Sequence, residues 1–367
     1  MLMKKLLVAT LVFGSLLVAQ AQFTPGALVA LRVGNGSAAL SSAGTPIFLD
    51  EFDPVGGSLV YSLAIPSSGF PALVNSGTAT SEGALNLSAN GQYLVLAGYN
   101  AAAGTPSIAG STSASVPRGV ATVDASGNYT LAATSTSFFS GNNIRSAASD
   151  GAGSFWAAGA NTGVAYMGNN SAATAVSASP LTNLRVIQTI GNNLFYSSGS
   201  GSSRGIYEVA GNPTSGSTTA VNLINNGSSA SPYDFAFNTA MTIAYVADSD
   251  AYTTSSGIGG VEKWSFNGSA WAFDYSFSLG TNGAVGLAVN FSGPNATIYA
   301  TSASGNSLFE VTDTGAGATG MLLATAGANE AFRGLDFAPQ ATPEPSTLAL
   351  GGLGLAAIGF LRRKLKA

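Results

Sequence analysis

Short apolar runs alternate with turn-forming clusters along most of this chain. From residue 23 to residue 339, runs rich in Val, Ile, Tyr, Phe and Ala are separated by clusters of Gly, Asn, Ser and Asp. No segment sustains the spacing of an amphipathic helix, in which apolar residues recur every three to four positions. Short apolar runs bounded by turn residues are instead typical of β-strands. The pattern therefore predicts a body that is nearly all β.

A unit of two strands joined by a turn recurs within this body. Its recognisable copies cover residues 84–97, 144–158, 184–196, 233–247 and 285–300. Their spacing of about 40 to 60 residues is the range of four-stranded propeller blades. In the first copy, Asn90-Gly91 separates two alternating runs, and this pair favours a type I′ hairpin turn.

The two ends of the body complete this pattern. Residues 332–339 resemble the first strand of a unit with nothing after it, and residues 27–33 resemble a second strand with nothing before it. In a ring, the last strand would complete the first blade and leave no open edge to invite aggregation. The body thus resembles β-propeller proteins, at the level of pattern and without a tight family motif. The expected fold is an all-β propeller of six or seven four-stranded blades, with a β-helix and tandem sandwiches as competing architectures.

At the N-terminus, a basic start precedes an apolar run. Two lysines are followed by the apolar residues 6–18 and then by Ala19 and Ala21, which flank one glutamine. This order of basic region, apolar region and small-residue cleavage site is that of a secretory signal peptide. We expect residues 1–21 to be a signal peptide, handled by the Sec translocation machinery and signal peptidase, and residues 22–340 to form the body. A buried core helix or a retained anchor is the alternative for the first segment.

The C-terminal residues 341–367 combine three features. They are, in order, Pro343-Glu344-Pro345, the apolar residues 348–361, and the basic residues Arg362, Arg363 and Lys364. About fourteen to sixteen apolar residues would span only ~21 to 24 Å as a helix, short of the ~30 Å hydrocarbon core. The basic cluster nevertheless favours a membrane segment, because Arg and Lys after an apolar stretch stay on the cytoplasmic side. We therefore expect a single transmembrane helix here.

This tail resembles the PEP-CTERM sorting domain of Gram-negative bacteria, since its three features occur in the family order at the extreme C-terminus. The resemblance covers only about the last 25 residues. It implies recognition and cleavage near Pro343-Glu344-Pro345 by a membrane-embedded exosortase, in bacteria that make exopolysaccharide. The helix would then be a temporary inner-membrane anchor, and the body would reach the cell surface or the extracellular matrix. A permanent single-pass anchor is the alternative.

Composition narrows the possible chemistry. The chain has no Cys and no His, and only 8% of its residues are charged. Ser-His-Asp triads, Cys-His dyads and nearly all zinc sites therefore lack their usual residues. Between the terminal segments, seven basic residues stand against sixteen acidic ones. A nucleic-acid partner is not expected, because phosphate neutralisation needs clustered Lys and Arg.

Two acidic groups are the candidate binding sites of the body. Asp248 and Asp250 follow an apolar run and precede a Gly/Ser-rich loop, so their carboxylates could serve as calcium ligands. The rest of an EF-hand spacing is missing, and solvated turn acids are the simpler interpretation. Asp50, Glu51 and Asp53 are the densest acidic group, and a carboxylate pair could perform acid/base work on a sugar. Turn capping is the simpler interpretation there, and no cofactor other than calcium is expected.

Aromatic side chains could stack on sugar rings if they were exposed. The candidates are Tyr99, Tyr252, Trp264, Trp271 and Tyr275. In a propeller, most aromatic residues at alternating positions pack between blades, so a core role is the default.

The sequence therefore favours a non-enzymatic surface or matrix protein, exported and sorted by its tail, that binds exopolysaccharide or another surface component. A passive structural role in the matrix is not distinguished from this by the sequence. The alternative is a propeller enzyme, a lyase or hydrolase that uses carboxylates or calcium on extracellular polysaccharide. Without His, such an enzyme would depend on Asp, Glu, Tyr, Arg or Lys263 for proton transfer. Acidic residues that converge at one mouth of the channel would favour the enzyme.

Overall fold

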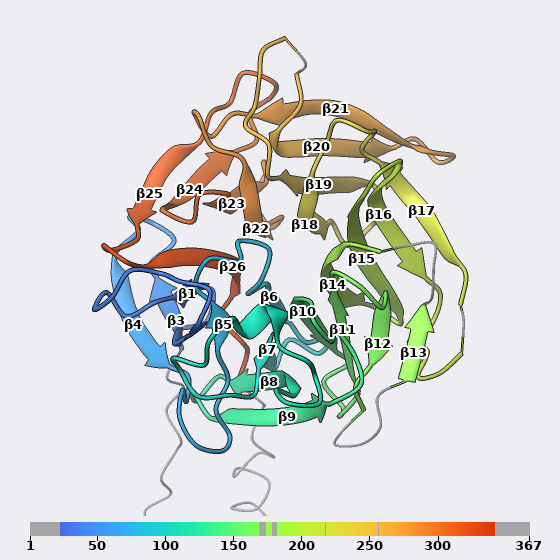
Figure 1. Cartoon of the computed structure of the whole chain (residues 1–367). Helices are drawn as coiled ribbons and strands as arrows, with labels where there is room; N and C mark the ends of the chain where they lie inside the picture. The colour runs from blue at the N-terminus through green and yellow to red at the C-terminus, as the bar shows by residue number, and fades with distance from the viewer. Residues whose placement is uncertain (1–22, 169–173, 178–181, 217, 256, 342–367) are drawn as a thin grey trace, which may run out of the picture.

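The body is a six-bladed β-propeller. The structure is a computed structural model that describes residues 23–168, 174–177, 182–216, 218–255 and 257–341. Six four-stranded sheets surround a central channel, and each sheet lies radially with one strand at the channel and three further out (Figure 1). The predicted fold is confirmed, and the blade number is six rather than seven.

Every blade is an antiparallel sheet, listed here from the channel outward. Blade 1 consists of β26 (Ala331–Phe337), β1 (Leu28–Val33), β3 (Ile47–Phe52) and β4 (Leu59–Ala64). Blade 2 consists of β6 (Leu85–Leu87), β7 (Tyr93–Tyr99), β8 (Arg118–Asp124) and β9 (Tyr129–Ser135). Blade 3 consists of β10 (Ile144–Ser149), β11 (Phe155–Gly159), β12 (Val164–Tyr166) and β13 (Thr174–Ser177).

The second half of the ring repeats this order. Blade 4 consists of β14 (Leu184–Ile190), β15 (Asn193–Ser200), β16 (Ser203–Val209) and β17 (Ala220–Asn225). Blade 5 consists of β18 (Pro232–Phe237), β19 (Ile243–Asp248), β20 (Gly260–Phe266) and β21 (Trp271–Phe277). Blade 6 consists of β22 (Ala284–Asn290), β23 (Thr297–Ser302), β24 (Ser307–Thr312) and β25 (Met321–Thr325).

The ring closes through its first blade, as the sequence predicts. β26, the last strand, pairs with β1 in a register that runs from Leu28 opposite Phe337 to Val33 opposite Ala331. Each end of the chain therefore supplies strands to one sheet, so the ring has no open seam at this point. Outside the blades, β2 (Gly44–Thr45), in the loop between β1 and β3, pairs with β5 (Asn75–Ser76), in the connection from blade 1 to blade 2. The 3₁₀ turn η1 (Ile108–Gly110) lies in the loop between β7 and β8.

The innermost strands are rich in small residues because they crowd around the axis. β10 reads IRSAAS and β22 reads AVGLAVN. The amide of Asn86 in β6 links three inner strands, since its Nδ2 donates to Ser146 Oγ at 3.1 Å, to Ala147 O at 2.8 Å and to Ile187 O at 3.1 Å. Polar groups next to the channel are thus bonded to the neighbouring blades, which fixes the blades relative to one another.

Apolar side chains fill the spaces between blades. Leu31 and Leu49 of blade 1 pack with Leu94 and Leu96 of blade 2, and all four are fully buried. Each blade presents alternating residues to its two neighbours, so the core is a ring of interblade layers rather than one central cluster.

One turn differs from the expectation. The hairpin between β6 and β7 is present, but its loop covers five residues, and Gly91 N donates to Ser88 O at 2.7 Å. Gly91 has φ +69°, whereas Asn90 is not among the residues with positive φ. A type I′ turn requires positive φ at both positions, so this turn is of another type.

Both terminal predictions fall outside the described residues. The signal peptide (1–21), with Ala19 and Ala21, and the expected transmembrane helix within 341–367 are therefore not described here. Among the described ranges, no helix is long and apolar enough to span a membrane.

Candidate functional site

One end of the channel collects basic side chains. Arg145 and Arg185 are the second residues of the innermost strands β10 and β14, and Arg333 is the third residue of β26. The starts of neighbouring inner strands lie side by side, since Ala84 N donates to Arg145 O at 3.2 Å and Gly334 N to Gly83 O at 2.9 Å. We call this end of the channel, where the innermost strands begin, the channel mouth.

A loop before β6 fills most of the channel mouth. Thr80, Ser81 and Glu82 line the remaining cavity together with Tyr233 and Arg333. The volume of this cavity is about 10 Å³, which is room for about one water molecule. The channel is therefore closed at this end to anything of substrate size.

Glu82 is an acidic residue at the channel mouth, and neighbouring groups donate hydrogen bonds to its carboxylate. Tyr99 OH donates to it at 2.6 Å, Ser76 N at 2.8 Å and Asn143 Nδ2 at 2.5 Å. Burial raises the pKa of Glu82, and these hydrogen bonds oppose that rise. Glu82 therefore ties together the loops beside the channel, and its charge opposes the lowering of the Arg333 pKa by burial although the two form no ion pair among the described residues.

Arg145 is almost fully buried beside blade 4. Its Nη1 donates to Asn183 Oδ1 at 2.5 Å and to Leu184 O at 3.0 Å, and its Nε has no partner among the described residues. Burial lowers the pKa of Arg145 to about 10, and the positive charge of Arg185 adds to this effect. A second guanidinium therefore lies close enough to repel the first.

Arg185 and Arg204 form the outer part of the same cluster, and both are partly exposed. The Arg185 guanidinium lies 4.0 Å from the centre of the Tyr233 ring, and its only hydrogen bond in the described chain is a long one to Ser231 Oγ, 3.5 Å. Arg204, at the start of β16, donates to Ala230 O. Burial and the charge of Arg204 lower the pKa of Arg185, while Tyr233 opposes the shift.

A glycine makes room for the Arg185 side chain. A Cβ built on Gly199 would lie 2.7 Å from both Nε and Nη2 of Arg185. Any larger residue at this position of β15 would displace the guanidinium. Gly199 thus helps to determine the position of the Arg185 guanidinium group.

Sequence reasoning missed this cluster, although a signal was present. In three of the repeats, an arginine directly follows the apolar residue near the start of the inner strand: Ile144-Arg145, Leu184-Arg185 and Phe332-Arg333. Aligning the copies on that residue would have placed the three arginines at one end of the channel.

The predicted calcium residues lie beside this cluster. Asp248, the last residue of β19, is fully buried, and its Oδ1 accepts from Ser231 N at 3.0 Å and from Asp250 N at 2.8 Å. Asp250 is exposed on the following turn. In the described part of the chain, no group of three or more acidic side chains is placed to hold a metal ion. Calcium binding by Asp248 and Asp250 stays a prediction.

Asp248 instead faces a second buried acid. Glu262 of β20 is 1% exposed, and its Oε2 accepts from Asn226 Nδ2 at 2.5 Å and from Trp264 Nε1 at 3.0 Å. The other oxygens of the two acids, Asp248 Oδ2 and Glu262 Oε1, are buried and have no hydrogen-bond partner among the described residues. Burial and the charge of Asp248 raise the pKa of Glu262 to about 8. The pair therefore carries one negative charge rather than two near neutral pH.

Two further acids lie inside the channel. Asp234 Oδ2 accepts from Leu287 N at 3.0 Å, and Asp336 Oδ2 accepts from Leu87 N at 2.6 Å. Burial raises the pKa of Asp336 to about 7 and that of Asp234 well above its ordinary value. These acids hold neighbouring blades together and do not converge at the channel mouth.

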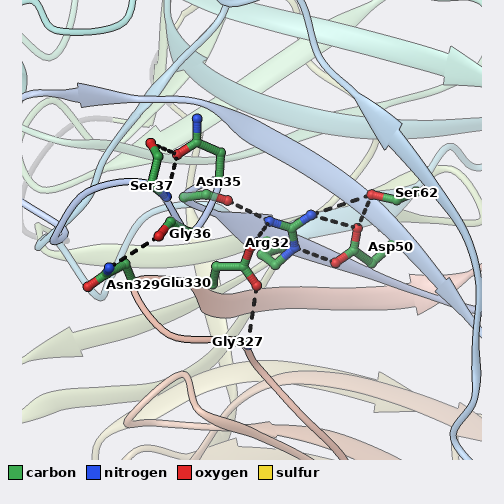
Figure 2. A network of polar contacts seen from close by, with 10 residues as sticks. Arg32, Asn35, Gly36, Ser37, Asp50, Ser62, Gly327, Asn329 and Glu330 are labelled. Carbon is green, nitrogen blue, oxygen red and sulfur yellow. Dashed lines mark hydrogen bonds and ion pairs between the residues drawn. The ribbon is translucent and has the colours of Figure 1, made fainter.

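The three acidic residues at 50–53 have separate roles. Asp50 pairs with Arg32, whose Nε lies 2.5 Å from Asp50 Oδ2 and whose Nη1 lies 2.7 Å from Glu330 Oε1 (Figure 2). Glu51 is fully buried and accepts from Thr24 N at 2.9 Å. Asp53 is exposed and caps the turn at Val55 N, 2.9 Å. Only Asp53 fits the expected turn cap, because Asp50 and Glu51 are neighbours in a strand and point to opposite faces.

The candidate aromatic residues are largely in the core. Tyr99 is fully buried, Trp264 is 7% exposed, and Tyr252, Trp271 and Tyr275 are partly exposed. Trp271 packs against Phe237 and Phe266, and Tyr275 against Phe277. They form no open stacking surface.

Lys263 belongs to a polar cluster between blades 5 and 6. Its Nζ lies 2.7 Å from Asp313 Oδ2, and Tyr245 OH and Tyr275 OH donate to the same carboxylate at 2.5 and 2.8 Å. Although burial acts to raise it, these hydrogen bonds hold the pKa of Asp313 below its usual value. The cluster lines a pocket of about 240 Å³ and joins the two blades.

The sequence carries a recognised sorting signal. Residues 341–364 match the PEP-CTERM protein-sorting motif, which includes Pro343-Glu344-Pro345 and Arg362-Arg363-Lys364. The motif implies an exported protein that transits the membrane and is recognised by an exosortase. No curated protein matches the sequence.

Solved structures resemble the body in fold. One is from a nidogen/laminin complex, with a TM-score of 0.53 and 12% identity over 86% of this chain and 100% of that one. The GH74 enzyme of Niastella koreensis has a TM-score of 0.46 and 16% identity, over 79% of this chain and 47% of that one. Hydrazine synthase of Kuenenia stuttgartiensis has a TM-score of 0.42 and 10% identity, with 75% of each chain covered. At these identities the likeness concerns the fold alone, and the chain is a six-bladed β-propeller protein that carries a PEP-CTERM sorting motif.

Proposed function

We propose that this is a non-enzymatic surface or matrix protein that associates with extracellular polysaccharide after exosortase-dependent sorting. The observation that carries the proposal is the PEP-CTERM motif at residues 341–364, because this signal implies passage through the membrane to the outside. The location thereby limits the ligands that the propeller meets to those of the cell surface and its matrix.

The geometry of the channel supports a binding role over a catalytic one. Asp234 is buried and Asp336 is partly exposed, and the carboxylates of both accept hydrogen bonds from backbone groups of neighbouring blades. The cavity at the mouth measures about 10 Å³, so a sugar has no access to these acids from that end. A lyase or hydrolase of the alternative kind would need such carboxylates next to an open cleft.

The test follows the protein in its native host. We expect the mature wild-type protein to fractionate with the exopolysaccharide, and its intact mass to show loss of the C-terminal tail. A variant with Pro343→Ala, Glu344→Ala and Pro345→Ala should keep the tail and remain in the membrane fraction. Recovery of wild-type protein in the same fractions from a strain that makes no exopolysaccharide would contradict the proposal.

A further inference from the structure

The basic residues of the body divide into paired and unpaired groups. Of the seven described Lys and Arg residues, Arg32 and Lys263 form the ion pairs found within the described ranges. Arg118 is buried among carbonyl oxygens, including Val116 O at 2.7 Å and Phe139 O at 2.8 Å. The remaining four all lie at or beside the channel mouth. We call Arg145, Arg185, Arg204 and Arg333 the mouth arginines.

Each mouth arginine keeps donors without acceptors. The Nε of all four is buried and has no hydrogen-bond partner among the described residues. Arg145 and Arg333 are 8% and 3% exposed, so their charges are largely removed from water as well. Burying a cation without a counter-charge is costly. An anion bound beside the partly exposed Arg185 and Arg204 would supply a counter-charge to the cluster.

The neighbouring acids are committed to other groups. Glu82 accepts from three donors of the surrounding loops, and Glu262 accepts from Asn226 and Trp264. Asp248 and the exposed Asp250 are near enough to raise the pKa of Arg185, but neither comes within ion-pair distance of it in the described structure. Asp248 Oδ2 and Glu262 Oε1 are themselves buried without a hydrogen-bond partner among the described residues, and no described acid forms an ion pair with any of the mouth arginines.

Access to the cluster is from outside the channel rather than through it. Arg185 and Arg204 are partly exposed, whereas the loop with Thr80 and Glu82 covers Arg333. Tyr233 supports the Arg185 guanidinium from one side at 4.0 Å, and the guanidinium packs directly against Gly199 on another side. An anionic group can therefore approach Arg185 and Arg204, with Arg145 behind them.

From this geometry we propose that Arg185, Arg204 and Arg145 bind an acidic sugar of the extracellular polysaccharide through its carboxylate or sulfate group. The planar guanidinium fork suits both oxyanions, because it offers two parallel N–H donors. This inference rests on the proposed function, and it names the chemistry that would make the association selective for acidic over neutral polysaccharide.

Titration calorimetry of the purified full chain in mild detergent tests the site. The probes are a carboxylated oligogalacturonate, a sulfated dextran oligosaccharide and unmodified dextran, at about 0.15 M salt to screen unspecific attraction. We expect one or both acidic probes to bind and dextran not to bind. Arg185→Gln and Arg204→Gln should each weaken binding by about tenfold or more, because each removes charge-assisted hydrogen bonds.

Two controls separate the site from charge and from folding. Lys263→Gln removes the same charge between blades 5 and 6 and should leave the affinity within about twofold. Arg185→Lys keeps the charge but loses the fork, so it should weaken binding less than Arg185→Gln. Equal affinities of Arg185→Gln and Lys263→Gln, or binding of neither acidic probe, would overturn the inference.

Inorganic sulfate and acetate serve as further probes. Binding of these ions without binding of either oligosaccharide would make this an ion site and would also overturn the assignment to polysaccharide. The proposed function is tested separately, by whether the protein fractionates with the matrix in its host. Matrix association without oligosaccharide binding would leave the function standing and remove this site.

Discussion

Arg32 and Arg185 are both partly buried arginines on strands, yet their surroundings differ. Arg32 in blade 1 meets Asp50 and Glu330 at 2.5 and 2.7 Å, as Figure 2 shows. Arg185 at the channel mouth meets the Tyr233 ring and one hydroxyl at 3.5 Å. The first network is complete within the protein, whereas the second leaves strong donors free. The comparison distinguishes an arginine that stabilises the fold from one that is available to a ligand.

The largest expected effect comes from breaking the complete network. Arg32→Met should lower the free energy of unfolding by about 3–5 kcal/mol, because it leaves the buried Asp50 carboxylate without its partner. Urea denaturation followed by far-UV circular dichroism measures this. A loss below about 1 kcal/mol would mean that the network contributes no more than an exposed ion pair.

The buried acids give the next effect, through pH. Glu262 and Asp336 have pKa values raised to about 8 and about 7 in the folded protein. Unfolding returns both to near 4, so the folded state holds more protons between these limits. Stability from these two acids is therefore fully present below about pH 4 and is lost progressively as pH rises to 7 to 8.

A matched variant tests how much of this dependence of stability on pH comes from Glu262. In Glu262→Gln, the amide keeps the size of the side chain and does not titrate. Thermal unfolding across pH 5 to 8 should show a flatter slope than in wild type. An unchanged slope of stability against pH would mean that groups other than Glu262 cause it.

The polar cluster between blades 5 and 6 gives a smaller effect. Lys263→Met leaves Asp313 with its two tyrosine donors and should cost about 1–2 kcal/mol in urea denaturation. Tyr245→Phe is the companion variant, because it removes a hydrogen bond but no charge. A larger loss for Tyr245→Phe than for Lys263→Met would show that the hydroxyl matters more than the ion pair.

The smallest effect is expected at the channel mouth. Arg185→Gln and Arg204→Gln should change the free energy of unfolding by less than about 0.5 kcal/mol, since no ion pair is broken and repulsion is relieved. Arg32→Gln provides the contrast in the same assay. A loss as large as that of Arg32→Gln would mean that the mouth arginines stabilise the fold and that the comparison is wrong.

Much of the fold follows from local patterns. The repeated strand pairs, the Asn90-Gly91 hairpin and the closing strand at 332–339 are visible because period-two alternation and turn residues act over a few positions. Closure was predictable because each end of the body contains half of a unit. The blade number was open between six and seven because β12 and β13 of blade 3 are short and weakly patterned.

The candidate site could not be derived in the same way. Arg32 reaches Glu330 across 298 residues, and Asp248 meets Glu262 across two strands. Such contacts depend on the register and direction of strands, which the sequence pattern leaves open. Whether an arginine is paired or free is likewise a property of the assembled ring.

The last strand carries the chain from one end of the channel to the other. β26 starts at the channel mouth near Arg333 and ends at the opposite side of the ring, where Gln340 N donates to Gly91 O at 2.8 Å in the β6–β7 turn. The sorting motif begins at residue 341, directly after this contact. The mouth arginines and the first residue of the sorting motif therefore lie at opposite ends of the propeller, so the described chain leaves the ring on the side away from the arginine cluster.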